Sequence, residues 1–300
     1  MMYREQTASW SLSEAIFGKA KDYLQLTKFT LSFLVVFSCV VGYLMVPQVN
    51  IGSAKVLLLF IAGICITGAA NAFNQLMERD TDALMRRTAG RPLPAGRMQP
   101  VEALTVALVL TLAGLILLSV YFNPLAAWVS LISLCLYAFV YTPWKRWNSL
   151  AVFVGAFPGA LPPLIGWIAG SGTLSAGGWS LFLLQFFWQF PHFWAIAWIA
   201  HEDYQRAGFR LLPGNGTRNA YAAMQILSFT ILLIMAGFLP YLLHVYGSFA
   251  LSAGLLTGAY LLYRAWKLVE KCDSASARQL MFAAYIYFIA VQFAMLIDKI

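Results

Sequence analysis

The sequence predicts an all-α, polytopic membrane protein with about nine transmembrane helices. Of its 300 residues, 61% are hydrophobic and only 11% are charged, against about 25% charged residues in an ordinary soluble domain. The mean hydropathy is +0.72. Continuous apolar runs such as "VLLLFIAGICITGAA" also lack the alternation of a transmembrane β-barrel. Helices that satisfy their own backbone hydrogen bonds in lipid are therefore expected.

Nine apolar stretches are long enough to cross about 30 Å of hydrocarbon, which takes about 20 residues of helix. They lie near 29–46, 53–77, 103–121, 125–142, 149–169, 180–200, 221–240, 243–263 and 279–297. Residues 1–28 carry acidic side chains and lack a short apolar core before a cleavage site, so we interpret them as a cytoplasmic lead-in and not as a signal peptide. Residues 29–300 are predicted to form one intramembrane domain.

The basic residues predict the orientation of the chain. Once the nine spans are drawn, 18 of the 20 lysines and arginines fall on one side of the membrane, and only Lys55 and Lys299 fall on the other. By the positive-inside rule, that side is cytoplasmic, with the N-terminus inside and the C-terminus outside. The net charge of +8 is thus a topology signal and does not indicate nucleic-acid binding.

The most hydrophilic stretch, "NQLMERDTDALMRRTAGRPLPAGR" (74–97), begins where the second span ends. Asn74, Glu78 and Asp82 recur every four residues, so on a helix they drift by only about 40° per step and share one face. One amide and two carboxylates are suitable ligands for a Mg²⁺ ion that also binds phosphate oxygens. Asp80 would point away from this face. The alternative is a solvated loop between two helices, but such a loop would not explain the four-residue spacing.

Four arginines follow this ladder of Asn74, Glu78 and Asp82. They are Arg86, Arg87, Arg91 and Arg97, and they flank "RPLPAG", where the prolines and the glycine end the helix and impose a loop. Guanidinium groups bind phosphate through two parallel hydrogen bonds and keep their charge. Carboxylates for a metal beside arginines for phosphate indicate a diphosphate site at the membrane surface.

Three ordered stretches carry a family resemblance. They are 74–97, "YAFVYTPWKRWNSLAVFVGAFPGALPPLIGW" (137–167) and "WQFPHFWAIAWIAHEDYQRAGFRLLP" (188–213). Together they resemble the UbiA-type intramembrane prenyltransferases and, within them, the protoheme IX farnesyltransferase (heme O synthase) family. The resemblance covers residues 70–215 in detail and the nine-helix outline throughout. It implies helices around a central cavity that opens to the cytoplasmic side.

The resemblance also implies roles for individual residues. Asn74, Glu78 and Asp82 would hold Mg²⁺ and act in catalysis with Lys145, while Arg87, Arg91 and Lys145 would neutralise the rest of the diphosphate. Glu202 and Asp203 occupy the region of a second aspartate-rich motif. The usual DxxxD spacing is absent there, because Ile199 stands four residues before Asp203. Arg206 is therefore expected to do part of a metal ion's work.

The reaction implied by the resemblance transfers farnesyl from farnesyl diphosphate to a vinyl group of heme B, with addition of water, and gives heme O for a terminal oxidase. Mg²⁺ would be the cofactor and heme B a substrate, since no CxxCH motif is present for covalent attachment. The expected location is the bacterial inner (plasma) membrane. Heme A synthase or the oxidase assembly are the expected protein partners, with no nucleic acid.

Histidines and aromatic residues are the candidates for the heme side. His192 follows Pro191 inside the sixth span, where a proline is expected to loosen the helix. A buried ionisable residue at that depth is usually functional, although a packing histidine with satisfied hydrogen bonds is the alternative. Tyr141, in "YTPWKR", is either a substrate contact or an interfacial anchor. His201 is either a propionate contact or solvated, and His244 is expected on the outer surface.

Two further functions remain open from the sequence. A prenyltransferase of the same type could act on an aromatic quinone precursor or another macrocycle, because "RTAGRPLPAG" does not identify the acceptor. A secondary transporter of anions would also need acids and arginines. Transporters place their sites near the membrane midplane, however, whereas the charge clusters here all lie at one membrane face.

Overall fold

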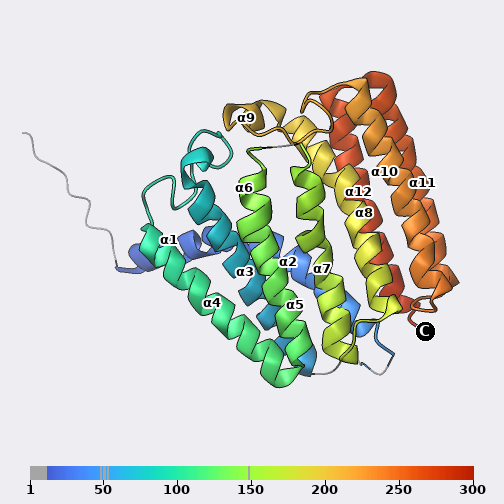
Figure 1. Cartoon of the computed structure of the whole chain (residues 1–300), viewed down its shortest axis with the longest axis horizontal. Helices are drawn as coiled ribbons and strands as arrows, with labels where there is room; N and C mark the ends of the chain where they lie inside the picture. Colours follow the sequence, from blue (N-terminus) through green and yellow to red (C-terminus); the bar gives the residue numbers. More distant parts are fainter. Residues whose placement is uncertain (1–11, 48, 50–51, 53, 148) are drawn as a thin grey trace, which may run out of the picture.

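Helices packed side by side make up nearly all of the computed structural model, which describes residues 12–47, 49, 52, 54–147 and 149–300 (Figure 1). The elements are α1 (Leu12–Leu26), α2 (Phe29–Leu44), α3 (Ala54–Asp82), α4 (Pro100–Tyr121), α5 (Pro124–Cys135), the π-helix η1 (Leu136–Tyr141), α6 (Thr142–Trp144), α7 (Ala151–Ser171), α8 (Ala176–Ile199), α9 (His201–Arg206), α10 (Ala220–Leu242), α11 (Ser248–Lys271) and α12 (Ser274–Ile297). Within the described residues, β-structure is limited to one isolated bridge, between Tyr246 and Lys299. The predicted all-α class is confirmed.

The number of membrane spans is lower than predicted when helices are judged by length and composition. Among the described residues, six helices pass this test, or up to seven if the bent pair formed by α1 and α2 is one span. The predicted count of nine is therefore not confirmed. Each of the nine predicted ranges does overlap a helix, but α8 carries Gln185, Gln189 and His192, and α11 ends in a charged turn. These polar residues lower the mean hydropathy of both helices.

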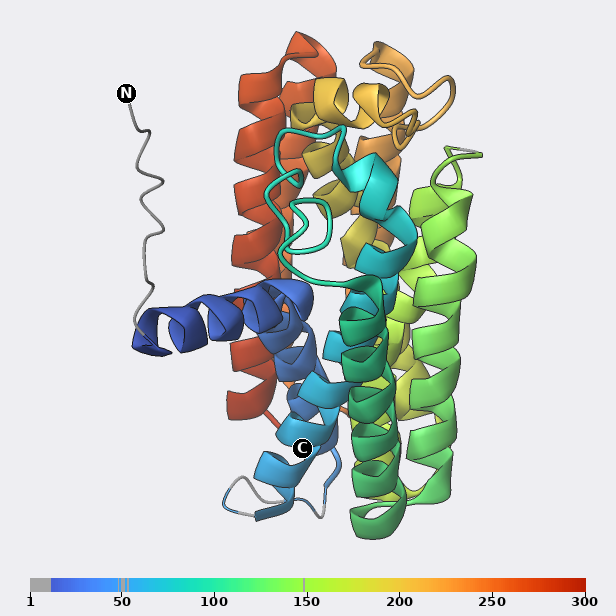
Figure 2. The ribbon, with the colours of Figure 1, turned by 90° about the vertical axis from the view of Figure 1, so that its left-hand side faces the viewer.

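The N-terminal part of the chain contains a helix that the sequence analysis did not predict. Helix α1 occupies residues that were interpreted as a lead-in, and residues 1–11 lie outside the described part. The axes of α1 and α2 meet at 48°, and α1 projects sideways from the bundle (Figure 2). Asp22 of α1 accepts a hydrogen bond from Arg97 at 3.0 Å, and Gln75 of α3 donates to the carbonyls of Gln25 and Leu26. Polar contacts thus attach α1 beside the end of α3.

Prolines do not interrupt the helices in which irregularity was expected. Helix α7 continues from Ala151 to Ser171 with Pro158, Pro162 and Pro163 inside it, and α8 continues through Pro191. The sixth predicted span is one continuous helix, and its loosening at Pro191 stays a prediction. The irregular segment is instead η1, where the helix widens between α5 and α6. Such π-helical turns are often found at functional sites.

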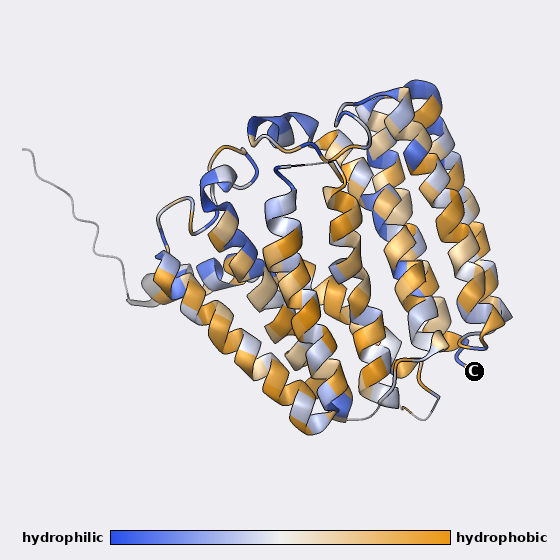
Figure 3. Ribbon diagram, viewed as in Figure 1, coloured by the Kyte–Doolittle hydropathy of each residue, from blue (hydrophilic) through white to orange (hydrophobic). Residues whose placement is uncertain are grey.

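Polar residues gather at one edge of the bundle. Hydrophilic residues cover the end of α3, α9 and the turn between α11 and α12, whereas the middle of the bundle is mainly hydrophobic (Figure 3). This edge contains the segments that follow α3, α6, α8 and α11. The basic segments that follow these four helices therefore lie at one edge, whereas α1 projects from the bundle farther from it (Figure 2).

Candidate active site

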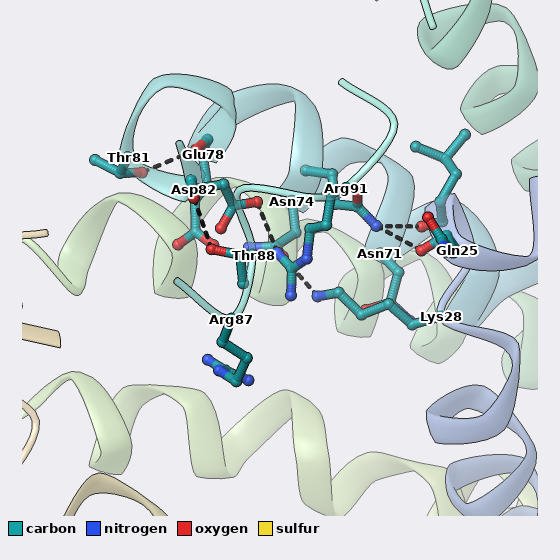
Figure 4. Close-up of polar contacts among 12 residues, drawn as sticks. Gln25, Lys28, Asn71, Asn74, Glu78, Thr81, Asp82, Arg87, Thr88 and Arg91 are labelled. Carbon is teal, nitrogen blue, oxygen red and sulfur yellow. Dashed lines mark hydrogen bonds and ion pairs between the residues drawn. The ribbon is translucent and has the colours of Figure 1, made fainter. Parts of the chain in front are cut away.

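The ladder of Asn74, Glu78 and Asp82 lies on the last turns of α3, which ends at Asp82. All three side chains are buried, with 1%, 4% and 0% of their surface exposed. Each one has a cationic partner from a different part of the chain (Figure 4): Lys28 Nζ lies 2.9 Å from Asn74 Oδ1, Lys145 Nζ lies 2.9 Å from Glu78 Oε1, and Arg91 Nη1 lies 2.6 Å from Asp82 Oδ2. Three cations therefore converge on the predicted ladder face.

The groups at the ladder shift one another's pKa, and they favour the charged form of Glu78 but not that of Lys28. Burial on its own would raise the pKa of Glu78, but the charge of Lys145 and its hydrogen bond outweigh burial and hold the pKa below its usual value. Burial lowers the pKa of Lys28 to about 7, and the neighbouring Arg91 and Lys145 act in the same direction. The site therefore combines a stabilised carboxylate with closely spaced positive groups, an arrangement suited to a polyanion.

Asp82 carries the observation that bears on a metal ion. Its Oδ2 is paired with Arg91, but its Oδ1 is buried and has no hydrogen-bond partner among the described residues. A buried carboxylate oxygen without a partner is costly, and a cation or its water would satisfy it. No group of three or more His, Cys, Asp or Glu side chains that could hold a metal occurs in the described part of the chain. Two carboxylates and an amide fit Mg²⁺, which keeps several waters and binds phosphate oxygens.

Asn74 is held in place by contacts on both ends of its amide group. Its Oδ1 accepts from Lys28, and its Nδ2 donates to Thr142 Oγ1 at 3.1 Å. Thr142 lies at the start of α6, directly after η1. The residue that directly follows the π-helical turn thus contacts the ladder.

Lys145 and Tyr141 lie together, as their spacing in "YTPWKR" suggested. The Lys145 ammonium is 4.6 Å from the centre of the Tyr141 ring, a cation–π distance. Gly155 of α7 lies close against the same ring, because a Cβ at this glycine would meet Tyr141 Cε2 at 2.6 Å. Tyr141 is thereby fixed beside the lysine that binds Glu78.

Arg87 does not join the ladder, in contrast to Arg91. Its guanidinium is directed away from Asp82 (Figure 4) and donates to the Tyr204 hydroxyl of α9 at 3.2 Å. Asp203 pairs with Arg206 at 3.2 Å within α9, and Glu202 is exposed. The contact between Arg87 and Tyr204 joins the segment after α3 to the region of the second predicted motif. A shared role of α9 with the ladder stays a prediction.

Two residues of this site were missed by sequence reasoning. Lys28 lies between α1 and α2 with φ of 47°, a left-handed conformation that is uncommon for a residue other than glycine. In the sequence analysis, Lys28 was only one of the basic residues that predict the orientation of the chain. Thr142 is uncharged, and no spacing or motif in the sequence marked it as a site residue. Both residues meet Asn74 only through tertiary packing, from positions 46 and 68 residues away.

The three histidines differ in burial. His192 is 4% exposed, His201 is half-buried and His244 is exposed, as predicted for an outer-surface residue. His192 Nδ1 is buried and has no hydrogen-bond partner among the described residues. A role of His192 in binding substrate stays a prediction.

A bundle of membrane helices with a buried acidic ladder and converging cations at one edge is the architecture of an intramembrane enzyme for diphosphate substrates. Residues 35–290 match the model of the UbiA prenyltransferase family, and the chain belongs to this family.

Relatives with curated names are similar along almost the whole chain. The protoheme IX farnesyltransferase of Cytophaga hutchinsonii is 42% identical, with 93% of this chain and 97% of the relative covered. The protoheme IX farnesyltransferase of Flavobacterium psychrophilum is 43% identical, with 93% and 94% covered.

Solved structures share the fold at low sequence identity. A digeranylgeranylglyceryl phosphate synthase structure has a TM-score of 0.77 at 20% identity, with 94% of this chain and 99% of that chain covered. A UbiA homolog from Archaeoglobus fulgidus bound to DMAPP and Mg²⁺ has a TM-score of 0.66 at 18% identity, with 92% and 99% covered. These similarities show the fold of an intramembrane prenyltransferase.

Proposed function

We propose that this chain is a protoheme IX farnesyltransferase, which transfers farnesyl from farnesyl diphosphate to a vinyl group of heme B and, with addition of water, gives heme O. The observation that carries the proposal is the buried ladder of Asn74, Glu78 and Asp82 with a cation on each member. The choice of heme as acceptor is supported by the relatives that carry this name at 42% and 43% identity over most of the chain.

The residues at the ladder bind and neutralise the diphosphate. In the reaction, the bond between the farnesyl carbon and the diphosphate oxygen breaks, and the vinyl group forms a carbon–carbon bond to the farnesyl carbon. Water then adds to the cation left beside the macrocycle and loses a proton, which gives the hydroxyl group of the product. Lys28, Arg91 and Lys145 stabilise the charge that develops on the departing diphosphate. Because these cations are already held by the ladder oxygens, they need little reorganisation during the reaction, which is how preorganised charge lowers a barrier.

Mg²⁺, when bound to Asn74, Glu78 and Asp82, supplies further positive charge to the diphosphate oxygens. The chain itself supplies the orientation of these ligands. Thr142 fixes the Asn74 amide, Arg91 holds one oxygen of Asp82, and the second oxygen of Asp82 is left without a protein partner. The apolar spans below the ladder exclude water from the allylic cation until the vinyl group reacts.

The acceptor side and the second motif complete the proposed site. His192 is the residue we assign to the acceptor, and Tyr141, which lies against Lys145, is assigned to substrate at the ladder. Arg87 is assigned to substrate together with Glu202, Asp203 and Arg206 of α9, which it approaches through Tyr204. The basic edge of the bundle faces the cytoplasm, with the N-terminus inside and the C-terminus outside the bacterial inner membrane. Heme A synthase or the terminal oxidase would receive the product.

The test is an incubation of the purified protein in detergent with heme B, farnesyl diphosphate and Mg²⁺, followed by mass spectrometry of the separated pigments. We expect a product heavier than heme B by one farnesyl group plus water. Unchanged heme together with prenylation of an aromatic acid or another macrocycle would contradict the assigned acceptor and leave the prenyltransferase assignment intact.

A further inference from the structure

His192 is a buried histidine with one ring nitrogen, Nδ1, that lacks a hydrogen-bond partner among the described residues. It lies on α8, a helix buried along most of its length. Its Nδ1 has no partner among the described residues, although buried polar groups in folded proteins are nearly always paired. A histidine kept only for packing would be expected to donate or accept at this atom. The unpaired nitrogen therefore points to a ligand.

Aromatic rings surround the imidazole on several sides. The Trp188 ring is stacked on it with centroids 4.7 Å apart and an angle of 13° between the planes, and Tyr285 of α12 meets it edge-on at 4.5 Å. Trp188 is itself fixed, because its Nε1 donates to the Ala284 carbonyl at 2.8 Å and its ring stacks on Phe288. The imidazole orientation is thus set by a rigid aromatic frame shared by α8 and α12.

The surface beside His192 is open and aromatic. Phe193, the next residue, is 40% exposed on a helix that is otherwise mostly buried. Tyr285 is half-buried on the facing helix. A flat, largely apolar macrocycle would cover these rings, which are otherwise available to lipid. An aromatic surface with one unpaired imidazole is the combination that a metalloporphyrin requires.

The depth of His192 agrees with the position of the diphosphate site. His192 precedes the end of α8 at Ile199 by seven residues, which is about 10 Å along a helix at 1.5 Å per residue. The segment after α8 carries Tyr204, which binds Arg87 at the edge where α3 ends. A macrocycle held at His192 would thus lie about 10 Å deeper in the membrane than that edge.

We infer that His192 is an axial ligand of the iron in heme B, and that this bond fixes the plane of the macrocycle during prenylation. The inference rests on the proposed function, since it assumes heme as the acceptor. Histidine is a common axial ligand of heme iron. The aromatic frame holds the imidazole, so one Fe–N bond would orient the heme macrocycle, which is nearly symmetric and has few other polar groups.

The first experiment uses the wild-type protein. Ferric heme B is titrated into the full chain in nanodiscs, and its binding is followed through the Soret band. Electron paramagnetic resonance then reports the axial ligand of the ferric iron, and resonance Raman spectroscopy of the ferrous form reports an iron–histidine stretch. We expect a histidine signature. A bound heme without it would overturn the inference, whatever any variant does.

The second experiment compares His192→Phe with His244→Asn. The phenylalanine keeps an aromatic ring on Trp188 but removes the nitrogen, and we expect the histidine signature to disappear and the heme affinity to fall by more than the roughly tenfold that loss of an outer-shell partner costs a metal site. His244 is exposed and has φ of 52°, which asparagine tolerates, so this control should bind heme as the wild type does.

The outcomes separate the inference from the proposed function. If wild-type protein farnesylates heme B but His192→Phe keeps the spectrum and affinity of the wild type, axial ligation by His192 is wrong and the function stands. If His192→Phe fails to fold, as judged by its thermal unfolding, the wild-type Raman and paramagnetic resonance spectra decide the question. If wild-type protein neither binds nor farnesylates heme, the function and the inference both fail.

Discussion

At the scale of single residues, Asp82 is the most informative side chain of the site. It is fully buried, with Oδ2 on Arg91 and Oδ1 unpaired. The sequence analysis assigned it to a membrane-surface site, so its complete burial is a finding of the structure. Asp82→Asn keeps the shape of the side chain and removes its charge. We expect turnover to fall by roughly 10²-fold or more, as when one preorganised charge interaction is lost, while the protein stays folded.

The matched control for this change is Asp80→Asn, two residues earlier on the same helix. The Asp80 side chain is 84% exposed and pairs only with the adjacent Arg79. Such surface pairs contribute little to stability, and we expect near-normal turnover. Turnover with farnesyl diphosphate and the temperature of thermal unfolding are measured for both variants. Full activity of Asp82→Asn, or equal losses in the two variants, would remove Asp82 from the catalytic group.

The ladder could be predicted from sequence, but its partners could not. Side chains four residues apart share a helical face, so the common face of Asn74, Glu78 and Asp82 could be predicted from local geometry. Lys28 and Thr142 reach Asn74 only because α1, α2 and α6 pack around α3. Arg87 was grouped with Arg91 by sequence proximity, yet the loop turns it toward Tyr204. The directions of side chains in a loop depend on tertiary contacts that no local pattern encodes.

At the scale of elements, the crossing of α2 and α7 depends on two glycines. A Cβ on Gly166 of α7 would fall on the Cys39 carbonyl and lie 2.8 Å from the Tyr43 nitrogen, and a Cβ on Gly42 of α2 would fall on the Pro163 carbonyl. The two backbones are in direct contact at both points. Small residues at helix crossings allow such close approach within membranes.

Gly166→Ala should therefore destabilise the protein. The added methyl group meets backbone atoms, which cannot rotate away as a side chain can, and overpacking typically costs about 1–3 kcal/mol. The control is Gly18→Ala on α1, where nothing lies within 4 Å of the new Cβ, so that the higher helix propensity of alanine should stabilise slightly. Thermal unfolding in detergent compares the two variants. An unchanged unfolding temperature for Gly166→Ala would contradict this prediction, because it would show that α2 and α7 can move apart without loss of stability.

The positions of the helices were predictable, but their local irregularities were not. Each long apolar run overlaps a helix, because burial of the backbone in lipid requires helix, but the count of nine spans is not confirmed. A proline was expected to loosen α8, and both α7 and α8 continue as helices through their prolines. The widened turn η1 contains no proline or glycine in its sequence LYAFVY. Its position follows from packing against α3, α5 and α7, which a single segment does not reveal.

At the scale of the whole molecule, charge and fold agree on one polar edge. The segments after α3, α6, α8 and α11 reach the same edge because successive helices run in alternating directions (Figure 3). The proposed diphosphate site lies at this edge, from which a water-soluble leaving group could depart without crossing the bilayer. Farnesyl and porphyrin are apolar and belong to the membrane side. In the proposed reaction, the diphosphate would therefore lie at the aqueous edge, and the farnesyl chain and the porphyrin would lie within the membrane.

The orientation of this edge leads to a test with the chain's own cysteines. Cys272 is exposed between α11 and α12, at the polar edge, whereas Cys39 is buried and Cys65 and Cys135 lie half-buried within spans. We expect a membrane-impermeant maleimide to label Cys272 in inside-out vesicles and not in intact cells, because the positive-inside rule assigns the positive edge to the cytoplasm. Cys272→Ser should abolish labelling. Adding Ser248→Cys, an exposed position at the start of α11 on the opposite edge, should restore labelling only from outside. Labelling of Cys272 in intact cells would reverse the proposed topology and put diphosphate release on the outer face.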